Sequence, residues 1–169
     1  NSPVDEVDYA ELDPLIIEMA KQYFPETAKK EFYDPRLRIS NTDAIFFLKS
    51  TYRQYDVILV GLRDITDLLS NRLFTEEFFS LVKGRLKPGG VFSFSLPGSM
   101  THLSKAMRRL NSCVLNALNK EFDYVRVIPG DYNIFLGSQN DINKVGPEMI
   151  MHRIKERSLS PSLFVGPYI

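Results

Sequence analysis

The feature that most constrains the fold is a regular alternation of short apolar runs with longer segments of helical periodicity. Strand-like runs are expected at residues 7–12, 37–39, 55–60 and 91–96. The segments of helical periodicity that follow them cover residues 14–23, 44–48, 76–86 and 101–122. This alternation predicts a doubly wound α/β domain with a mainly parallel sheet.

The end of the chain departs from this alternation. Residues 124–128 and 133–136 are strand-like and flank the turn-forming sequence Pro129-Gly130-Asp131-Tyr132. Two such runs around a short turn predict an antiparallel pair. A last, weaker helix is expected over residues 147–157.

Two of these segments carry specific expectations about burial. The run over residues 55–60 is apolar and bounded by polar residues, which suits a central parallel strand buried on both faces. The helix over residues 14–23 should begin at the cap Asp13, with Pro14 in its first position, and end at Pro25 before a charged loop. Its apolar stripe should face the core and consists of Leu15, Ile16, Met19, Ala20 and Tyr23.

Composition excludes several functional classes. Lys plus Arg equals Asp plus Glu at 21 each, so no net charge attracts nucleic acid or an anionic membrane. The single cysteine, Cys113, lies in an apolar stretch and is expected to be a buried thiol in a reducing compartment. His102 and His152 stand apart, so no metal site is expected. No run reaches the roughly 20 apolar residues that span a bilayer, and residues 1–169 are expected to form one soluble domain.

Acidic residues follow several of the expected strands, where ligands bind in parallel sheets. Glu11 could accept both hydrogen bonds of a ribose diol, or could be a solvated acid. Asp13 is better explained as a helix cap. Asp43 could accept from an adenine amine or cap the next helix, and Asp64 could approach an amine substrate or lie in a surface loop.

The order of the motifs is more specific than any single acid. The sequence contains Glu11-Leu12-Asp13-Pro14, Tyr23-Phe24-Pro25, Asp34-Pro35-Arg36-Leu37, Thr42-Asp43-Ala44, Tyr55-Asp56-Val57-Ile58, Leu73-Phe74-Thr75-Glu76-Glu77-Phe78 and Leu86-Lys87-Pro88-Gly89-Gly90-Val91. Over residues 7 to 97 this order strongly resembles the spermidine and spermine synthase family. A closer resemblance, to the membrane-fused spermidine synthase-like proteins of bacteria, extends nearly to Ile169. It rests on Ser70-Asn71-Arg72-Leu73-Phe74-Thr75, Phe94-Ser95-Leu96-Pro97-Gly98, Ile128-Pro129-Gly130 and Asn133-Ile134-Phe135.

The resemblance implies a Rossmann-like fold of the S-adenosylmethionine methyltransferase type and transfer of an aminopropyl group. The donor would be decarboxylated S-adenosylmethionine, and the acceptor a diamine such as putrescine. Glu11 matches the family acid that holds the ribose hydroxyls, and Asp43 matches the acid at the adenine amine. Asp64 matches the second acid of a paired-aspartate loop that helps to hold the amine, and no metal is implied.

Two departures from the family pattern are visible. The family has a strand and a glycine-rich turn before the Glu11 strand, and this chain begins too late to contain them. We therefore expect a domain that lacks its first strand, with a gap between the first and third of its own strands. That gap could be filled by direct pairing or by another chain's strand, or it could leave an open sheet edge for a homo-oligomer.

The second departure is Gly61, which stands where the family has the first acid of the pair. That acid acts as a base or electrostatic anchor toward the attacking amine, which is almost wholly protonated at neutral pH. A positioned base contributes about 10²–10⁴-fold, so its absence slows the reaction, and Asp64 or a water could substitute in part. Arg63 would repel a polyamine.

The function expected from this pattern is an aminopropyltransferase domain of a larger parent. The domain would lie on the cytoplasmic side of a parent that carries a membrane region, and residues 1–169 alone are expected to be inactive. One alternative is a methyltransferase-type enzyme that uses ordinary S-adenosylmethionine. The other is a non-catalytic module for nucleoside sensing or interaction, which Gly61 and Arg63 would favour.

Overall fold

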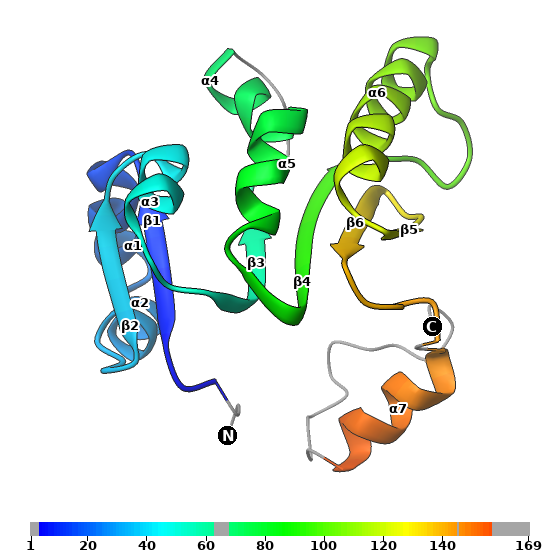
Figure 1. Cartoon of the computed structure of the whole chain (residues 1–169). Coiled ribbons are helices and arrows are strands. Elements are labelled where there is room, and N and C mark those ends of the chain that lie inside the picture. Colours follow the sequence, from blue (N-terminus) through cyan, green and yellow to red (C-terminus); the bar gives the residue numbers. More distant parts are fainter. Residues whose placement is uncertain (1–3, 63–67, 145, 157–169) are drawn as a thin grey trace. The chain divides into compact units, whose positions relative to one another are not determined.

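The computed structural model of the chain describes residues 4–62, 68–144 and 146–156. The chain divides into two compact units, Asn1–Arg53 and Gln54–Ile169 (Figure 1). Parallel strands connected by helices occur in both units, as the alternating sequence pattern predicted.

The first unit is built on two parallel strands, β1 (Val7–Glu11) and β2 (Leu37–Asn41). Its helices are α1 (Pro14–Tyr23), α2 (Pro25–Phe32) and α3 (Ala44–Ser50). The bounds of α1 agree with the prediction, but the charged loop expected after it is wrong. Pro25 is the first residue of α2. N–H groups in the first turn of a helix have no carbonyl partner within the helix, so proline costs no hydrogen bond there.

The apolar stripe of α1 was assigned to the wrong side. The buried residue of this helix is Ile17, whereas Leu15, Met19 and Tyr23 are exposed. A periodic pattern shows which side chains share a face of a helix, but tertiary packing decides which face is covered.

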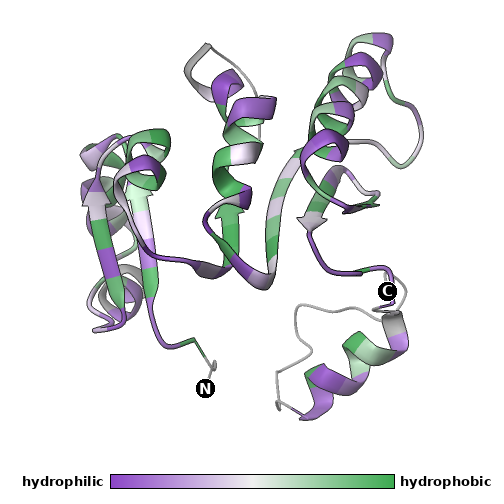
Figure 2. Cartoon of the chain, viewed as in Figure 1, coloured by the Kyte–Doolittle hydropathy of each residue, from purple (hydrophilic) through white to green (hydrophobic). Residues whose placement is uncertain are grey.

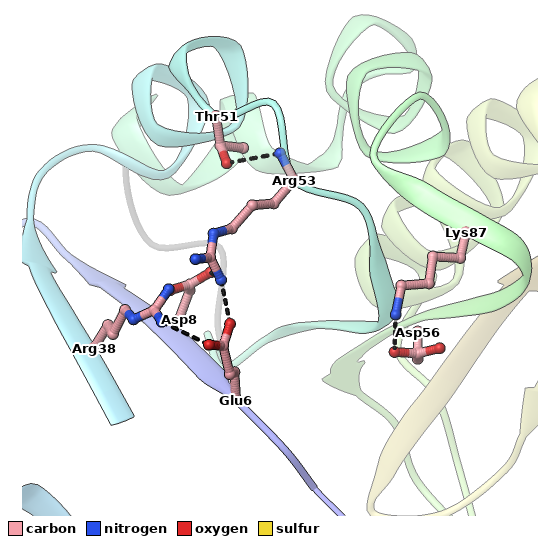
Figure 3. Close-up of polar contacts among 7 residues, drawn as sticks. All are labelled: Glu6, Asp8, Arg38, Thr51, Arg53, Asp56 and Lys87. Atoms are coloured by element: carbon pink, nitrogen blue, oxygen red, sulfur yellow. Dashed lines mark hydrogen bonds and ion pairs between the residues drawn. The ribbon is translucent and has the colours of Figure 1, made fainter. Parts of the chain in front are cut away.

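Ion pairs join the ends of three elements in this unit (Figure 3). Glu6, just before β1, accepts a 2.6 Å hydrogen bond from Arg38 of β2 and a second one from Arg53, which follows α3. Arg53 also lies 3.8 Å from Asp8, and its backbone N–H donates to Thr51. The arginines and Glu6 are half exposed, so water weakens these pairs.

The second unit contains a four-stranded sheet in the order β3-β4-β6-β5. Its strands are β3 (Tyr55–Val60), β4 (Leu86–Pro97), β5 (Tyr124–Ile128) and β6 (Tyr132–Ser138). β3 and β4 are parallel, and β6 is antiparallel to both of its neighbours, which confirms the predicted C-terminal strand pair. Its helical segments are α4 (Leu68–Asn71), η1 (Arg72–Phe74), α5 (Glu76–Lys83), α6 (Lys105–Glu121) and α7 (Pro147–Glu156).

Helix starts in this unit follow their capping residues. Thr75 caps α5, and its hydroxyl accepts from the Phe78 backbone N–H at 3.3 Å. The start of α6 was predicted four residues too early, because Ser104 rather than an earlier residue caps the helix by accepting from the Met107 backbone N–H.

An aromatic cluster forms the core of the second unit. The rings of Phe94 and Phe135 stack across β4 and β6 at 4.9 Å, and Phe79 of α5 stacks on Phe94 at 5.6 Å. Phe92 stacks on Phe122 at 6.0 Å. Alternate residues of a strand point to one face, and Figure 2 shows the resulting alternation of apolar and paler residues along β4. One face of the sheet therefore carries this core.

β3 is not the doubly buried central strand that its sequence predicted. Among the described strands it pairs with β4 alone, and Val57 and Leu59 are 54% and 72% exposed. Burial on both faces requires a neighbouring strand on each side and cover over each face. The expected gap between the first and third strands stays a prediction.

The environment of Cys113 also differs from the prediction. The residue is exposed on α6, while its neighbour Val114 takes the buried position. The apolar sequence around Cys113 therefore predicted its burial wrongly, because the buried position of this part of α6 belongs to the next residue. None of the helices in the described ranges has both the length and the apolar character needed to cross a bilayer.

Candidate functional site

Glu11 is the last residue of β1 and lies opposite Asn41, the last residue of β2. Both oxygens of its half-buried carboxylate accept hydrogen bonds, Oε2 from the Tyr9 hydroxyl at 2.9 Å and Oε1 from the Asp13 backbone N–H at 3.0 Å. A carboxylate has about four acceptor positions. Glu11 is thus held in one orientation and retains capacity to accept from a diol.

Tyr9 is a site residue that sequence reasoning missed. Burial, followed by the hydrogen bond to Glu11, raises the pKa of its hydroxyl, so the group remains a neutral donor. Residues two apart on a strand share a face. That spacing was the available signal for Tyr9.

Asp43 is the N-cap of α3 and lies two residues beyond the end of β2. Its Oδ1 accepts from the backbone N–H groups of Ile45 and Phe46 at 3.0 and 3.1 Å, so the predicted cap is confirmed. Contact with an adenine amine remains a prediction. Because β1 and β2 are parallel and Glu11 faces Asn41, Glu11 and Asp43 come to the same edge of this sheet.

Asp13 is the N-cap of α1, as predicted. Its Oδ1 accepts from the Leu15 backbone N–H at 2.9 Å. Its backbone N–H in turn donates to Glu11, so the start of α1 orients the carboxylate that is our candidate for binding the ribose.

Gly61 directly follows β3, at the carboxyl end of that strand. A Cβ atom added there would meet nothing within 4 Å, and its backbone does not lie in the left-handed region that favours glycine. Neither space nor conformation in the described surroundings therefore requires glycine at this position. Asp64 and Arg63 lie outside the described residues.

The turn after β4 shares an edge with Gly61 in the second unit. β3 and β4 are parallel with Val60 opposite Phe94, so both strands end on the same side of the sheet. Pro97 ends β4 opposite Tyr132, and the Gly98 backbone N–H donates to the Asp131 carbonyl at 2.8 Å. The turn between β5 and β6 thus lies against the end of β4.

A pair of asparagines at this edge gave no sequence signal. Asn111 of α6 and Asn133 of β6 are 22 positions apart, and their side chains share a 3.1 Å hydrogen bond. No group of His, Cys, Asp and Glu residues suited to a metal ion occurs among residues 4–62, 68–144 and 146–156.

Solved structures define the class of fold. A spermidine synthase in complex with the transition state analogue AdoDATO is 25% identical, with a TM-score of 0.71 over 89% of this chain and 53% of that one. Human methyltransferase-like protein 13 in complex with SAH is 21% identical, with a TM-score of 0.69 over 97% of this chain and 76% of that one. The chain has the Rossmann-like fold of the S-adenosylmethionine methyltransferase type, as predicted.

The family follows from the sequence match. The model of the spermine/spermidine synthase domain matches residues 2–141, and the chain belongs to this family. A polyamine aminopropyltransferase of Oceanobacillus iheyensis is 39% identical over 52% of this chain and 17% of that protein. The enzyme of the same name from Synechococcus sp. is 29% identical over 94% of this chain and 52% of that protein. The chain thus spans about half, or less, of the length of these curated relatives.

Proposed function

We propose that the whole protein transfers an aminopropyl group from decarboxylated S-adenosylmethionine to a diamine. The observation that carries the proposal is the placement of Glu11 and Asp43 at one edge of the parallel β1–β2 pair, in a chain of the spermine/spermidine synthase family. In the reaction, the amine nitrogen forms a bond to the methylene carbon beside the sulfonium. The carbon–sulfur bond breaks, its electron pair stays on sulfur, and methylthioadenosine leaves.

The nucleoside co-substrate assigns a role to each acid of the first unit. The Glu11 carboxylate would accept from the two ribose hydroxyls, since Tyr9 and Asp13 already fix its orientation. Asp43 would accept from the exocyclic amine of adenine while it continues to cap α3. The solved relatives described with AdoDATO and SAH support a nucleoside co-substrate of the S-adenosylmethionine type.

The amine side of the site rests on Asp64 and Gly61. The attacking nitrogen must lose a proton, and Asp64 is the residue that we assign to help hold the amine. Gly61 supplies no carboxylate, so we expect a slow transferase rather than a fast one.

Steady-state assays of the whole protein with decarboxylated S-adenosylmethionine and putrescine test the proposal. We expect methylthioadenosine to form, and Glu11→Gln to raise the KM for the nucleoside about tenfold, which corresponds to roughly 1.4 kcal/mol. Glu18→Gln is the matched control, because Glu18 is an exposed acid of α1. Nucleoside binding without turnover of any diamine would contradict the proposal and point instead to the sensing or interaction module.

Asp43→Asn separates the two roles of Asp43. Asparagine caps helices about as well as aspartate, so the melting temperature should change little. Loss of the anionic acceptor should nevertheless weaken binding of the adenine nucleoside. Unchanged affinity in a folded variant would leave Asp43 as a cap alone.

Among the described strands β3 pairs with β4 alone, and this supports a second proposal, that two copies of the chain associate along its other edge. An apolar strand with a free edge is a template for pairing with another strand, and Leu59 and Val57 are exposed on one face of it. Light scattering should show a dimer that Leu59→Lys weakens. A monomeric wild-type protein would refute this edge as a self-association site.

We also propose a cytoplasmic location for these residues, on the cytoplasmic side of a parent protein with a membrane region. The proposal rests on the resemblance of Phe94-Ser95-Leu96-Pro97-Gly98 to membrane-fused relatives. Fractionation of cells that express the whole protein, with protease protection of this domain, tests it. Recovery of the whole protein outside the membrane fraction would count against attachment.

A further inference from the structure

The side chain of Asn111 joins α6 to the end of β4. Its Nδ2 group donates to the Met107 carbonyl one turn earlier at 2.9 Å and to the Pro97 carbonyl at 3.1 Å. Both amide hydrogens are therefore committed to carbonyl groups. The Oδ1 atom must then face the other way, where it can only accept.

Asn133 completes a chain of hydrogen bonds. It is 9% exposed, and its Nδ2 donates to Asn111 Oδ1 at 3.1 Å. Its own Oδ1 accepts from the Gly130 backbone N–H at 3.3 Å. The bonds run in one direction, from the Gly130 N–H through both amides to the Pro97 carbonyl, so neither amide can be flipped without breaking a bond. We call these two side chains the asparagine relay.

The two turns that the relay connects also touch through their backbones. The Gly98 N–H donates to the Asp131 carbonyl at 2.8 Å. A Cβ atom added at Gly98 would lie 2.3 Å from the Gly130 carbonyl oxygen and 2.7 Å from Asn133 Oδ1. Only glycine lets the backbone of one turn approach the other this closely.

The relay lies at the edge of the sheet where ligands are expected. Pro97 ends β4 on the same side as Gly61 after β3, and parallel strands bind ligands beyond their carboxyl ends. Helix α6 begins after the Pro97–Gly98 turn and contacts β5 (Figure 1). The relay thus ties α6 and both turns together at this edge.

Stability alone is a weak explanation for a relay of this kind. Burying amide groups has a desolvation cost that their hydrogen bonds only offset, and apolar groups of the same shape can be nearly as stable. A satisfied, directional network instead selects one geometry for the groups that it joins.

We propose that Asn111 and Asn133 are positioning residues of the substrate site. The relay makes the turn after β4 and the turn between β5 and β6 a single rigid element against which the reacting groups are aligned. This inference rests on the proposed aminopropyl transfer. Misplacement of reacting groups by about 1 Å can cost about 10²-fold in rate, so the main effect of breaking the relay should fall on kcat.

Kinetics of the whole protein test the proposal. Asn111→Ala and Asn133→Ala should each lower kcat about 10- to 100-fold, with little change in KM for the nucleoside. Because one relay is broken in both cases, the double variant should be no worse than either single one. Asn111→Asp should behave like Asn111→Ala, since a carboxylate would oppose the Pro97 and Met107 carbonyls. Additive losses, or an unchanged kcat, would overturn the proposal.

Val114→Ala is the control for a general loss of stability. Val114 is buried on the same helix and takes no part in the relay. The variant should lower the melting temperature while kcat stays near the wild-type value. If kcat falls as far as in the asparagine variants, the relay has only a structural role.

A wild-type protein without aminopropyl transfer would count against the proposed function itself. In that case amide hydrogen exchange still tests whether the relay couples the two turns. Asn111→Ala should speed exchange of the Gly98 N–H about tenfold or more, although Asn111 makes no hydrogen bond to that group in the described structure. Val114→Ala should leave it protected. Unchanged Gly98 protection in Asn111→Ala would show that the two turns are not coupled through the relay.

Discussion

The Tyr9 hydroxyl donates a 2.9 Å hydrogen bond to the Glu11 carboxylate from the same face of β1. The Asp13 backbone N–H holds the other carboxylate oxygen. The Glu11 carboxylate, our candidate for binding the ribose, is therefore oriented by its own strand and by the start of the helix that follows, within five residues of sequence. Local structure builds this half of the site, which is why the sequence pattern could locate it.

Tyr9→Phe tests the value of that orientation. The variant removes the donor and keeps the ring, so Glu11 should sample more orientations and bind a ribose diol less well. A hydrogen bond contributes about 0.5–1.5 kcal/mol net. We therefore expect the dissociation constant of the whole protein for methylthioadenosine to be roughly two- to tenfold higher in the variant. Titration calorimetry measures this constant. Equal affinity in the folded variant would show that Asp13 alone suffices.

Gly61→Asp tests the missing base. The structure leaves room for the side chain, since nothing described lies within 4 Å of the added Cβ atom. We expect kcat for aminopropyl transfer to rise about tenfold or more, because a positioned base typically contributes 10²–10⁴-fold. Gly146→Asp is a charge-matched control at another glycine with open space around it. A rate that rises equally in both variants would argue against a base at Gly61.

The ion pair between Asp34 and Arg36 predicts a dependence of stability on pH. Hydrogen bonds from the Arg36 side chain and backbone lower the pKa of Asp34 to about 2. The unfolded value is near 3.9, so the pair stabilises the folded state above pH 4 and loses this effect as the pH falls toward 2. The melting temperatures of the wild type and Asp34→Asn should differ at pH 6 and converge by pH 2. A constant difference across this range would contradict the assignment.

Sequence predicted the elements better than it predicted their surroundings. Pro14–Tyr23 was predicted to the residue because Asp13 and Pro14 mark its start locally. Burial was predicted wrongly for β3 and for Cys113, since a strand edge and a helix face depend on which distant segments cover them. Apolar character says that a residue can be buried, and only the partners decide that it is.

The residues of the candidate site likewise fall into those that the sequence located and those that it did not. Glu11 and Asp43 are brought to one edge by the parallel register of β1 and β2, which the alternating pattern implied. The asparagine relay was invisible because Asn111 and Asn133 come from separate elements whose contact depends on how α6 packs. Spacing rules act within an element, and they carry no information about pairs of this kind.

Two glycines of the second unit allow a matched test of packing. A Cβ atom at Gly137 would lie 2.9 Å from the Phe122 ring, which is itself buried and stacked on Phe92. At Gly84, the C-cap of α5, the nearest atom would lie at an ordinary 3.5 Å and the backbone is right-handed. The two sites therefore differ in space and not in the residue introduced.

Gly137→Ala should destabilise the protein by about 1–3 kcal/mol, because the added methyl group must displace a ring that the core holds in place. For a chain of this length that corresponds to a melting temperature lower by roughly 2–12 °C. Gly84→Ala should be neutral or stabilise by about 0.4–1 kcal/mol, since alanine reduces the freedom of the unfolded chain at a compatible position. Thermal unfolding of both variants measures the difference. If Gly137→Ala melts at or above the wild-type temperature, the Phe122 ring can move freely, and the stacked aromatic core does not fix the pairing of β4 with β6.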